Sequence, residues 1–178
     1  MKKILIVGAG AMGAAFSIPL LDNGHSVALT EPYNFKLLKK LNSKKKIHPS
    51  LNINLPKKLK INKFSSEILN RKWDLIVIAV SSIGIDLIGK NLSKVKNKSP
   101  ILVLTKGLKF DGRNLISMSS LLKKYNKNLN ISVLKGPCLA KELSRKVKSF
   151  TVVANKNINT AKKIGKLIST NYYQTEFS

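Results

Sequence analysis

Short apolar runs alternate with amphipathic stretches along the chain, which predicts a repeating order of strand and helix. The predicted strands are Lys3–Val7, Ser26–Thr30, Lys60–Phe64, Leu75–Val80, Ile101–Leu104, Ile131–Leu134, Phe150–Ala154 and Tyr172–Thr175. The predicted helices are Met12–Asn23, Asn34–Leu41, Ser66–Asn70, Ile83–Leu92, Arg113–Lys124, Leu139–Lys146 and Thr160–Ser169. Strands that alternate with helices in this way indicate a parallel sheet that helices cover on both faces.

One segment interrupts this order. The residues from Ile47 to Lys58 contain Pro49 and Pro56 and show no clear hydrophobic period. A residue before proline is driven toward extended backbone, so we expect an ordered but irregular connection here. His48 lies at its start and is expected to help shape this loop near the ligand cleft.

The first predicted strand leads directly into a Gly8-x-Gly10-x-x-Gly13 loop. A loop of this kind, between a strand and a helix, is typical of a turn that binds the pyrophosphate of a dinucleotide. In that interpretation Gly8 allows the tight turn, Gly10 lets the pyrophosphate approach the backbone, and Gly13 lets the helix pack close to the strand. The alternative is a purely structural glycine turn, and the strand and helix on either side favour the dinucleotide.

Glu31 follows the second predicted strand, about 20 residues beyond the glycine loop, where a ribose-binding carboxylate is expected. A carboxylate there accepts hydrogen bonds from the ribose diol and repels a 2′-phosphate, so NAD is favoured over NADP if Glu31 points inward. The alternative is a surface loop residue beside Pro32.

Together these features predict an α/β, Rossmann-like doubly wound, mostly parallel sheet with helices on both faces. The length of 178 residues suits one domain, residues 1–178, and a hydrophobic content of 43% is enough for a core. No apolar stretch approaches the ~20 residues that span a membrane. A single cysteine, Cys138, excludes an intrachain disulfide and suits the cytoplasm.

The net charge of +25 does not by itself indicate a nucleic-acid-binding protein. Arginine reads phosphates and base edges with two parallel hydrogen bonds. Only three of the 33 basic residues of this chain are arginines, namely Arg71, Arg113 and Arg145. We therefore expect no nucleic-acid partner. A positive field still attracts phosphorylated small molecules.

Ligands of an open parallel sheet bind beyond the carboxyl ends of its strands. The fourth predicted strand ends near Ser81, which is suited to cap the next helix or to contact the cofactor. After the fifth strand comes Lys106, whose ammonium would pair with a substrate phosphate or polarise a carbonyl oxygen. Gly136, Pro137 and Cys138 follow the sixth strand, with Pro137 expected in the first turn of a helix.

Cys138 is expected to line the site rather than to act as a nucleophile, because no histidine lies near it in the sequence. The chain contains two histidines and one cysteine, so we expect no metal site.

Five segments occur in a fixed order: GAGAMGAA, NGHSVAL, HPSLNINLP, VLTKGL and GPCLAKEL. Taken together they resemble the N-terminal domain of NAD(P)-dependent glycerol-3-phosphate dehydrogenases, over essentially the whole chain. The most specific part is the Lys106-Gly107-Leu108 triplet followed by Gly136-Pro137-x-x-Ala140-x-Glu142. The glycine loop alone would fit many families.

The resemblance implies interconversion of dihydroxyacetone phosphate and sn-glycerol 3-phosphate by hydride transfer with NAD, or with NADP, feeding glycerophospholipid synthesis. It also implies a phosphorylated triose as substrate, a homodimer of the full-length protein, and Lys106 as a catalytic residue against both cofactor and substrate. The implied cofactor-binding residues are Gly8, Gly10, Ala11, Met12, Gly13, Glu31, Ser81, Lys106, Ala140 and Glu142, and the implied substrate-binding residues are Lys106, Gly136 and Cys138.

The sequence departs from the family pattern at Lys135, where a small or hydroxyl residue is usual, and at Cys138, where Ser, Thr or Asn is commoner. Family members continue into a helical second domain, and this chain is expected to stop before it. The alternatives are a related reductase of the ketopantoate reductase or β-hydroxyacid dehydrogenase type, or a non-catalytic nucleotide-sensing domain.

Overall fold

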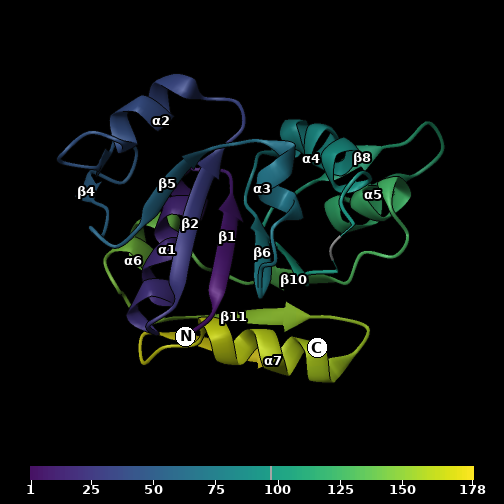
Figure 1. Ribbon diagram of the computed structural model, residues 1–178. Helices are drawn as coiled ribbons and strands as arrows, with labels where there is room; N and C mark the ends of the chain where they lie inside the picture. Colours follow the sequence, from purple (N-terminus) through teal and green to yellow (C-terminus); the bar gives the residue numbers. More distant parts are fainter. Residues whose placement is uncertain (97) are drawn as a thin grey trace.

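Eight strands form one central sheet in the computed structural model, which describes residues 1–96 and 98–178 (Figure 1). The order across the sheet is β12 (Tyr173–Phe177), β11 (Ser149–Ala154), β10 (Ile131–Lys135), β7 (Ile101–Val103), β6 (Leu75–Ile78), β1 (Lys3–Val7), β2 (Ser26–Glu31) and β5 (Lys60–Lys63). Neighbouring strands are parallel except β10 and β11, which are antiparallel. This confirms the Rossmann-like, mostly parallel sheet.

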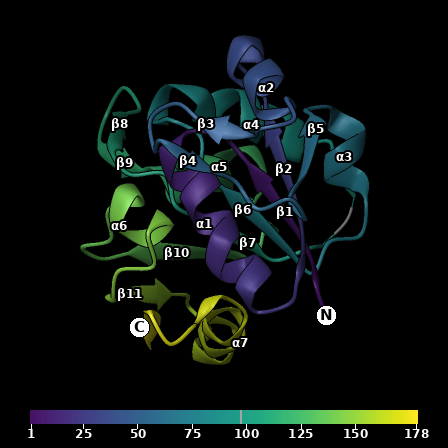
Figure 2. The same cartoon turned by 90° about the vertical axis from the view of Figure 1, so that its left-hand side faces the viewer.

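Helices cover both faces of this sheet, as predicted (Figures 1 and 2). One face carries α1 (Ala11–Asp22), α2 (Phe35–Leu41), α6 (Ala140–Ser144) and α7 (Ile158–Ile168). The other carries α3 (Ser66–Asn70), α4 (Ile85–Leu92) and α5 (Met118–Tyr125), with the short 3-10 helix η1 (Ser82–Gly84) before α4. In the described residues no helix has the length and apolarity that a bilayer crossing requires.

The strand β1 shows why an apolar run without alternation becomes a central strand. Ile4 and Ile6 pack into the hydrophobic cluster on the α1 face, whereas Leu5 and Val7 pack into the cluster on the α4 face. Successive side chains of a strand point to opposite faces, so a strand covered on both sides needs apolar residues at every position. All four side chains are fully buried.

The predicted helix Arg113–Lys124 is wrong in its first half. A hairpin of β8 (Leu108–Phe110) and β9 (Leu115–Ser117) stands there, and α5 begins only at Met118. The hairpin turns at Gly112, whose φ of 98° is a left-handed value, while the Asp111 carboxylate accepts hydrogen bonds from the backbone after it. Turn geometry therefore prevails over helix propensity at this point.

The connection from Ile47 to Lys58 is more regular than expected. It contains a small two-stranded sheet of β3 (Ile47–His48) and β4 (Ile53–Asn54), closed by a turn in which the Asn52 N–H donates to the His48 carbonyl. Leu51 and Leu55 are buried in the cluster on the α1 face. These two leucines thus belong to the core, whereas Ile47 at the start of the segment is exposed.

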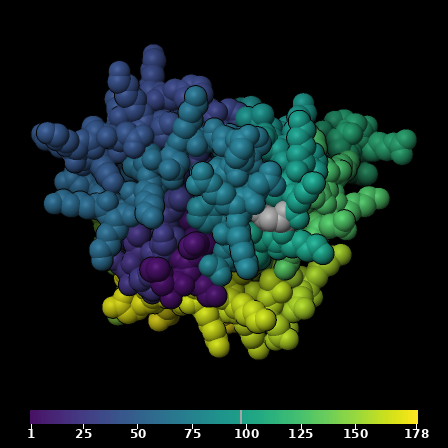
Figure 3. Space-filling view, in the orientation of Figure 1, coloured from purple at the N-terminus to yellow at the C-terminus, as the bar shows by residue number. Residues whose placement is uncertain are grey.

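The start of the chain, in dark purple, lies next to the yellow C-terminal segment on the face seen in Figure 3. His25, in the turn before β2, has its Nε2 atom 3.1 Å from the carbonyl oxygen of Leu167. The side-chain amide of Asn23 donates to the carbonyls of Leu167 and Ser169, and so provides hydrogen-bond donors for carbonyl groups at the end of α7. This side of the molecule carries the amino ends of the parallel strands, opposite the carboxyl ends where ligands of such sheets bind.

Candidate functional site: a glycine loop between two cavities

The glycine loop joins β1 to α1 in a bend that requires glycine at two positions. Gly8 has a φ of 110°, and a Cβ added there would lie 2.6 Å from the Ala79 carbonyl. A Cβ on Gly13 would lie 1.9 Å from the carbonyl oxygen of Gly8, so only glycine lets α1 pack this close to the strand. At Gly10, by contrast, packing does not require glycine, because an added Cβ would meet no atom within 4 Å.

Gly10 is also the N-cap of α1 and is exposed. The first N–H groups of a helix have no acceptor within the helix, and the helix dipole favours an anion at this end. The open space at Gly10 therefore fits a phosphate that approaches the backbone closely, as the diphosphate of a dinucleotide does. The N–H groups of Ala11 and Met12 follow in the same first turn.

Glu31, at the end of β2, is only 6% exposed and is held by backbone N–H groups. Its Oε2 accepts a hydrogen bond of 2.7 Å from Ala9, and its Oε1 accepts bonds from Tyr33 and Asn34. The carboxylate thus points inward toward the glycine loop, as the ribose-binding interpretation requires. It is not the surface loop residue of the alternative interpretation.

Two cavities lie on either side of the glycine loop and share Ala79 and Val80 as a common wall. The first has a volume of about 410 Å³ and extends from Glu31 over the start of η1. Its lining residues are Gly8, Gly10, Glu31, Tyr33, Asn34, Leu37, Ala79, Val80, Ser81, Ile83 and Gly84. The Tyr33 hydroxyl donates to the Gly84 carbonyl and so joins the two sides of this cavity.

The second cavity, of about 340 Å³, lies between the start of α1 and the loop before α6. Its lining residues are Ala11, Met12, Ala79, Val80, Leu104, Thr105, Lys106, Leu134, Gly136, Cys138, Leu139 and Ala140. Both cavities contain residues that follow the carboxyl ends of parallel strands, where ligands of such sheets bind.

Lys106 is held at this edge by its two neighbours. Thr105 Oγ1 donates a hydrogen bond of 2.8 Å to the Val80 carbonyl, which fixes the end of β7 against the end of β6. Gly107 follows with a φ of 115°, a left-handed value that turns the chain into the β8–β9 hairpin. Lys106 itself is exposed and lines the second cavity, so its cationic side chain stands beside any ligand bound there.

Cys138 lines the same cavity but is 5% exposed. Burial raises the pKa of its thiol, which keeps the group neutral at pH 7 and unsuited to nucleophilic attack. Pro137 does not lie in a first helical turn as predicted, since α6 begins only at Ala140. Gly136, with a φ of 142°, turns the chain before that helix instead.

Most of the predicted site residues come together around these two cavities. Ser81 lines the first cavity and makes no capping hydrogen bond through its side chain. Glu142 is half-buried in α6 and lines neither cavity, so its contact with a cofactor stays a prediction. Sequence reasoning missed Tyr33 and Ile83, for which no local pattern distinguishes a lining residue from an ordinary loop residue.

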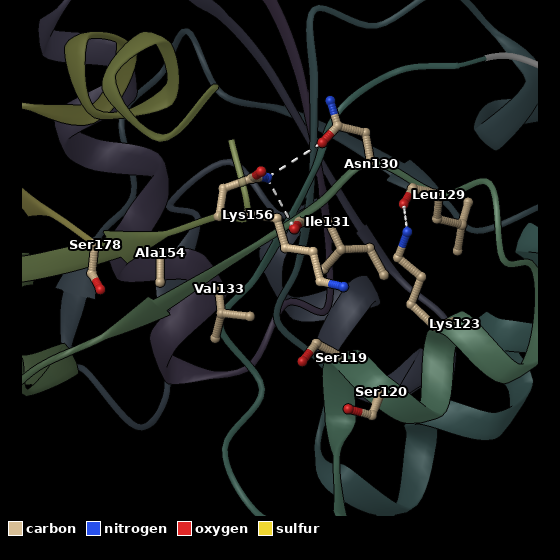
Figure 4. A pocket seen from close by; sticks show the side chains of 11 residues that line it. Ser119, Ser120, Lys123, Leu129, Asn130, Ile131, Val133, Ala154, Lys156 and Ser178 are labelled. Atoms are coloured by element: carbon tan, nitrogen blue, oxygen red, sulfur yellow. Dashed lines mark hydrogen bonds between the residues drawn. The ribbon is translucent and has the colours of Figure 1, made fainter. Parts of the chain in front are cut away.

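A third hollow, of about 510 Å³, lies near the amino end of β10, away from the carboxyl ends of the parallel strands (Figure 4). Ile131, Val133, Ala154 and Lys156 line it from β10, the end of β11 and the residues just after it, and Ser119, Ser120 and Lys123 line it from α5. The strands β10 and β11 are separated from β1 and its glycine loop by β7 and β6. This hollow is therefore not part of the candidate site.

Open space at the start of α1, an inward carboxylate at the end of β2 and a cavity on each side of the glycine loop define a dinucleotide-binding domain of the Rossmann type. Residues 3–161 match the family model for the NAD-dependent glycerol-3-phosphate dehydrogenase N-terminus, and the chain therefore belongs to this family. This confirms the resemblance found in the sequence.

Individual relatives agree with the family model. The chain is 30% identical to a glycerol-3-phosphate dehydrogenase (NAD(P)+) of Francisella tularensis, over 97% of its own length and 52% of the relative. It is 31% identical to the corresponding protein of Leptospira biflexa, with the same coverage. The chain thus spans about half the length of the curated relatives it matches.

Solved structures show the same fold. A glycerol-3-phosphate dehydrogenase of Coxiella burnetii has a TM-score of 0.83 at 20% identity, covering 99% of this chain and 54% of that one. The enzyme of Plasmodium falciparum has a TM-score of 0.87 at 16% identity, covering 99% of this chain and 52% of its own.

Proposed function

We propose that residues 1–178 are the NAD(H)-binding domain of an oxidoreductase that interconverts dihydroxyacetone phosphate and sn-glycerol 3-phosphate. The observation that carries the proposal is the open space at Gly10, beside the first turn of α1 and the inward carboxylate of Glu31. A dinucleotide placed there has its diphosphate at the helix N-terminus. The nicotinamide cofactor supplies the hydride.

The two cavities suit the two halves of the cofactor. The adenosine half fits the cavity between Glu31 and Ser81, where the carboxylate accepts hydrogen bonds from the ribose diol. The nicotinamide half fits the second cavity, against Ala11, Met12 and Ala140. Glu31 also disfavours a 2′-phosphate, so we propose a preference for NAD over NADP.

The substrate is placed beside the nicotinamide in the second cavity. Lys106 is the cation there, suited to hold an anionic triose phosphate or to stabilise negative charge on the substrate oxygen. Gly136 and the buried, neutral thiol of Cys138 line the same cavity and are proposed to contact the substrate. The full reaction, its place in glycerophospholipid synthesis, a homodimeric assembly and a location in the cytoplasm are proposed from the family alone.

Isothermal titration of the purified chain with NADH and NADPH tests the proposal. We expect binding of one NADH per chain with a dissociation constant below about 1 mM, a free energy of about −4 kcal/mol or better, and weaker binding of NADPH. Absence of heat with NADH at millimolar concentration would overturn the proposal. Equal affinity for both cofactors would be consistent with the binding site, but it would show that Glu31 does not select between NADH and NADPH.

A further inference from the structure

His48 lies outside the glycine loop in sequence but contacts it in the fold. The side chain is 1% exposed, and its Nε2 atom lies 3.0 Å from the carbonyl oxygen of Ala9. On the other side of the ring, Nδ1 lies 3.3 Å from the backbone N–H of Leu51. Because a backbone N–H only donates, Nδ1 accepts, the ring is neutral and the proton is on Nε2. His48 therefore donates to Ala9.

Ala9 is held from two directions by side chains of distant segments. Its N–H donates to Glu31, and its carbonyl accepts from His48. Ala9 is fully buried, so both of its backbone groups depend on these partners. The peptide that joins Ala9 to Gly10 is trans, so its C=O and N–H point in opposite directions.

We propose that His48 is a positioning residue for the dinucleotide site: it holds the Ala9 carbonyl and thereby directs the Gly10 N–H away from the protein, toward the cofactor diphosphate. The inference rests on the proposed function. Without the bond from His48, the Ala9 carbonyl is buried without a partner. The Ala9–Gly10 peptide then rotates to find one, and the Gly10 N–H leaves the direction that the phosphate requires.

The competing interpretation is that His48 only fills space and closes the turn to Leu51. Two substitutions separate the two roles, because each keeps one of the ring's hydrogen bonds. His48→Gln places an amide nitrogen at the same number of bonds from Cβ as Nε2, so it keeps the donor to Ala9 and loses the acceptor for Leu51. His48→Asn places its oxygen near the position of Nδ1, so it keeps the acceptor for Leu51 and is too short to reach Ala9.

The test measures NADH affinity by titration and the backbone amide spectrum of the uniformly ¹⁵N-labelled, ligand-free chain. We expect His48→Gln to bind NADH within about 3-fold of the unchanged chain, and His48→Asn to bind about 5- to 10-fold more weakly, the effect of one hydrogen bond. In the free chain, loss of the imidazole ring shifts the Gly10 amide resonance in both variants, and we expect a clearly larger displacement in His48→Asn than in His48→Gln. Thermal unfolding without NADH checks that both variants fold.

The outcomes are distinguishable. If the unchanged chain does not bind NADH, the proposed function fails, whatever the variants do. If it binds and His48→Asn binds equally well, with a Gly10 resonance displaced no further than in His48→Gln, His48 has no positioning role. If His48→Gln loses as much affinity as His48→Asn, the contact with Ala9 is not what matters, and this inference is again overturned.

Discussion

The N–H of Ala9 donates to the Glu31 carboxylate across 2.7 Å, which ties the glycine loop to the end of β2. One side chain thus braces the loop and presents a negative charge where the ribose of a dinucleotide is expected. The other oxygen of this carboxylate accepts hydrogen bonds from the backbone N–H groups of Tyr33 and Asn34, in the turn after β2.

Replacing Glu31 by Gln keeps the size of the side chain and removes its charge. We expect NADH to bind about 3-fold more weakly and the preference for NADH over NADPH to fall about tenfold, because the repulsion of the 2′-phosphate disappears. Parallel titrations with both cofactors measure the ratio of affinities. An unchanged ratio would mean that another residue selects the cofactor.

Gly13→Ala is expected to destabilise the fold. The added Cβ overlaps the Gly8 carbonyl oxygen, at 1.9 Å, and this contact is with backbone that has little room to move. We expect a loss of about 3 kcal/mol in the free energy of unfolding, the upper end of the usual cost of overpacking. Urea unfolding followed by circular dichroism measures the loss, and an unchanged midpoint would contradict the close packing of α1 on β1.

Gly10→Ala is the matched variant with the opposite expectation. Gly10 has a φ of −59°, which alanine adopts without strain, and its Cβ would enter open space. The fold should therefore keep its stability within about 0.5 kcal/mol, while NADH affinity falls about tenfold or more because the methyl group occupies the phosphate space. Stability and affinity that both remain unchanged would show that the phosphate lies elsewhere.

Lys106→Met tests the cation of the second cavity. We expect NADH binding to change little, while the additional thermal stabilisation by dihydroxyacetone phosphate in the presence of NADH is lost with the charge that holds the phosphate. Lys90→Met, an exposed lysine of α4 outside both cavities, serves as the control. Equal stabilisation of the two variants by dihydroxyacetone phosphate would show that Lys106 does not bind the substrate.

The stability of the fold should depend on pH through His25. Burial lowers the pKa of His25 below its usual value of 6.5, with the nearby N-terminus acting in the same direction. The unfolded chain therefore binds this proton more readily than the folded chain, and the contribution of His25 is complete above pH 6.5 and decreases as the pH falls below it. Between pH 7.5 and 5.5 the melting temperature should fall.

In His25→Gln this part of the decrease should be absent. The lowered pKa values of Asp22 and Asp74 act only near and below their usual value of 3.8, so they do not affect this pH window. Melting curves of the two chains in matched buffers measure the difference. A decrease of equal size in both would contradict the assignment to His25.

The sequence predicts those features that depend on neighbouring residues. The apolar run Ile4–Val7, the spacing of Gly8, Gly10 and Gly13, and the position of Glu31 are all local signals, and the structure confirms the fold built from them. A short run that is apolar at every position, such as Ile4–Val7, favours a strand covered on both faces, because successive side chains of a strand point to opposite sides.

The helix prediction over Arg113–Lys124 missed a local signal, because Asp111-Gly112 is a turn sequence that starts a hairpin.

Features that depend on distant contacts were not predicted. The antiparallel direction of β11 leaves no trace in its own alternation of side chains. The contact of Tyr33 with Gly84 and that of His48 with Ala9 join segments far apart in the chain. Each is decided by packing that only the folded chain creates.

The central claim is that backbone N–H groups at the start of α1 hold the diphosphate of a dinucleotide. The most direct measurement is a titration of the ¹⁵N-labelled chain with NADH, followed through its backbone amide resonances. We predict the largest shifts at Gly10, Ala11 and Met12, with smaller ones along both cavities. Shifts confined to residues around the hollow of Figure 4, or no shift at the start of α1, would contradict the account.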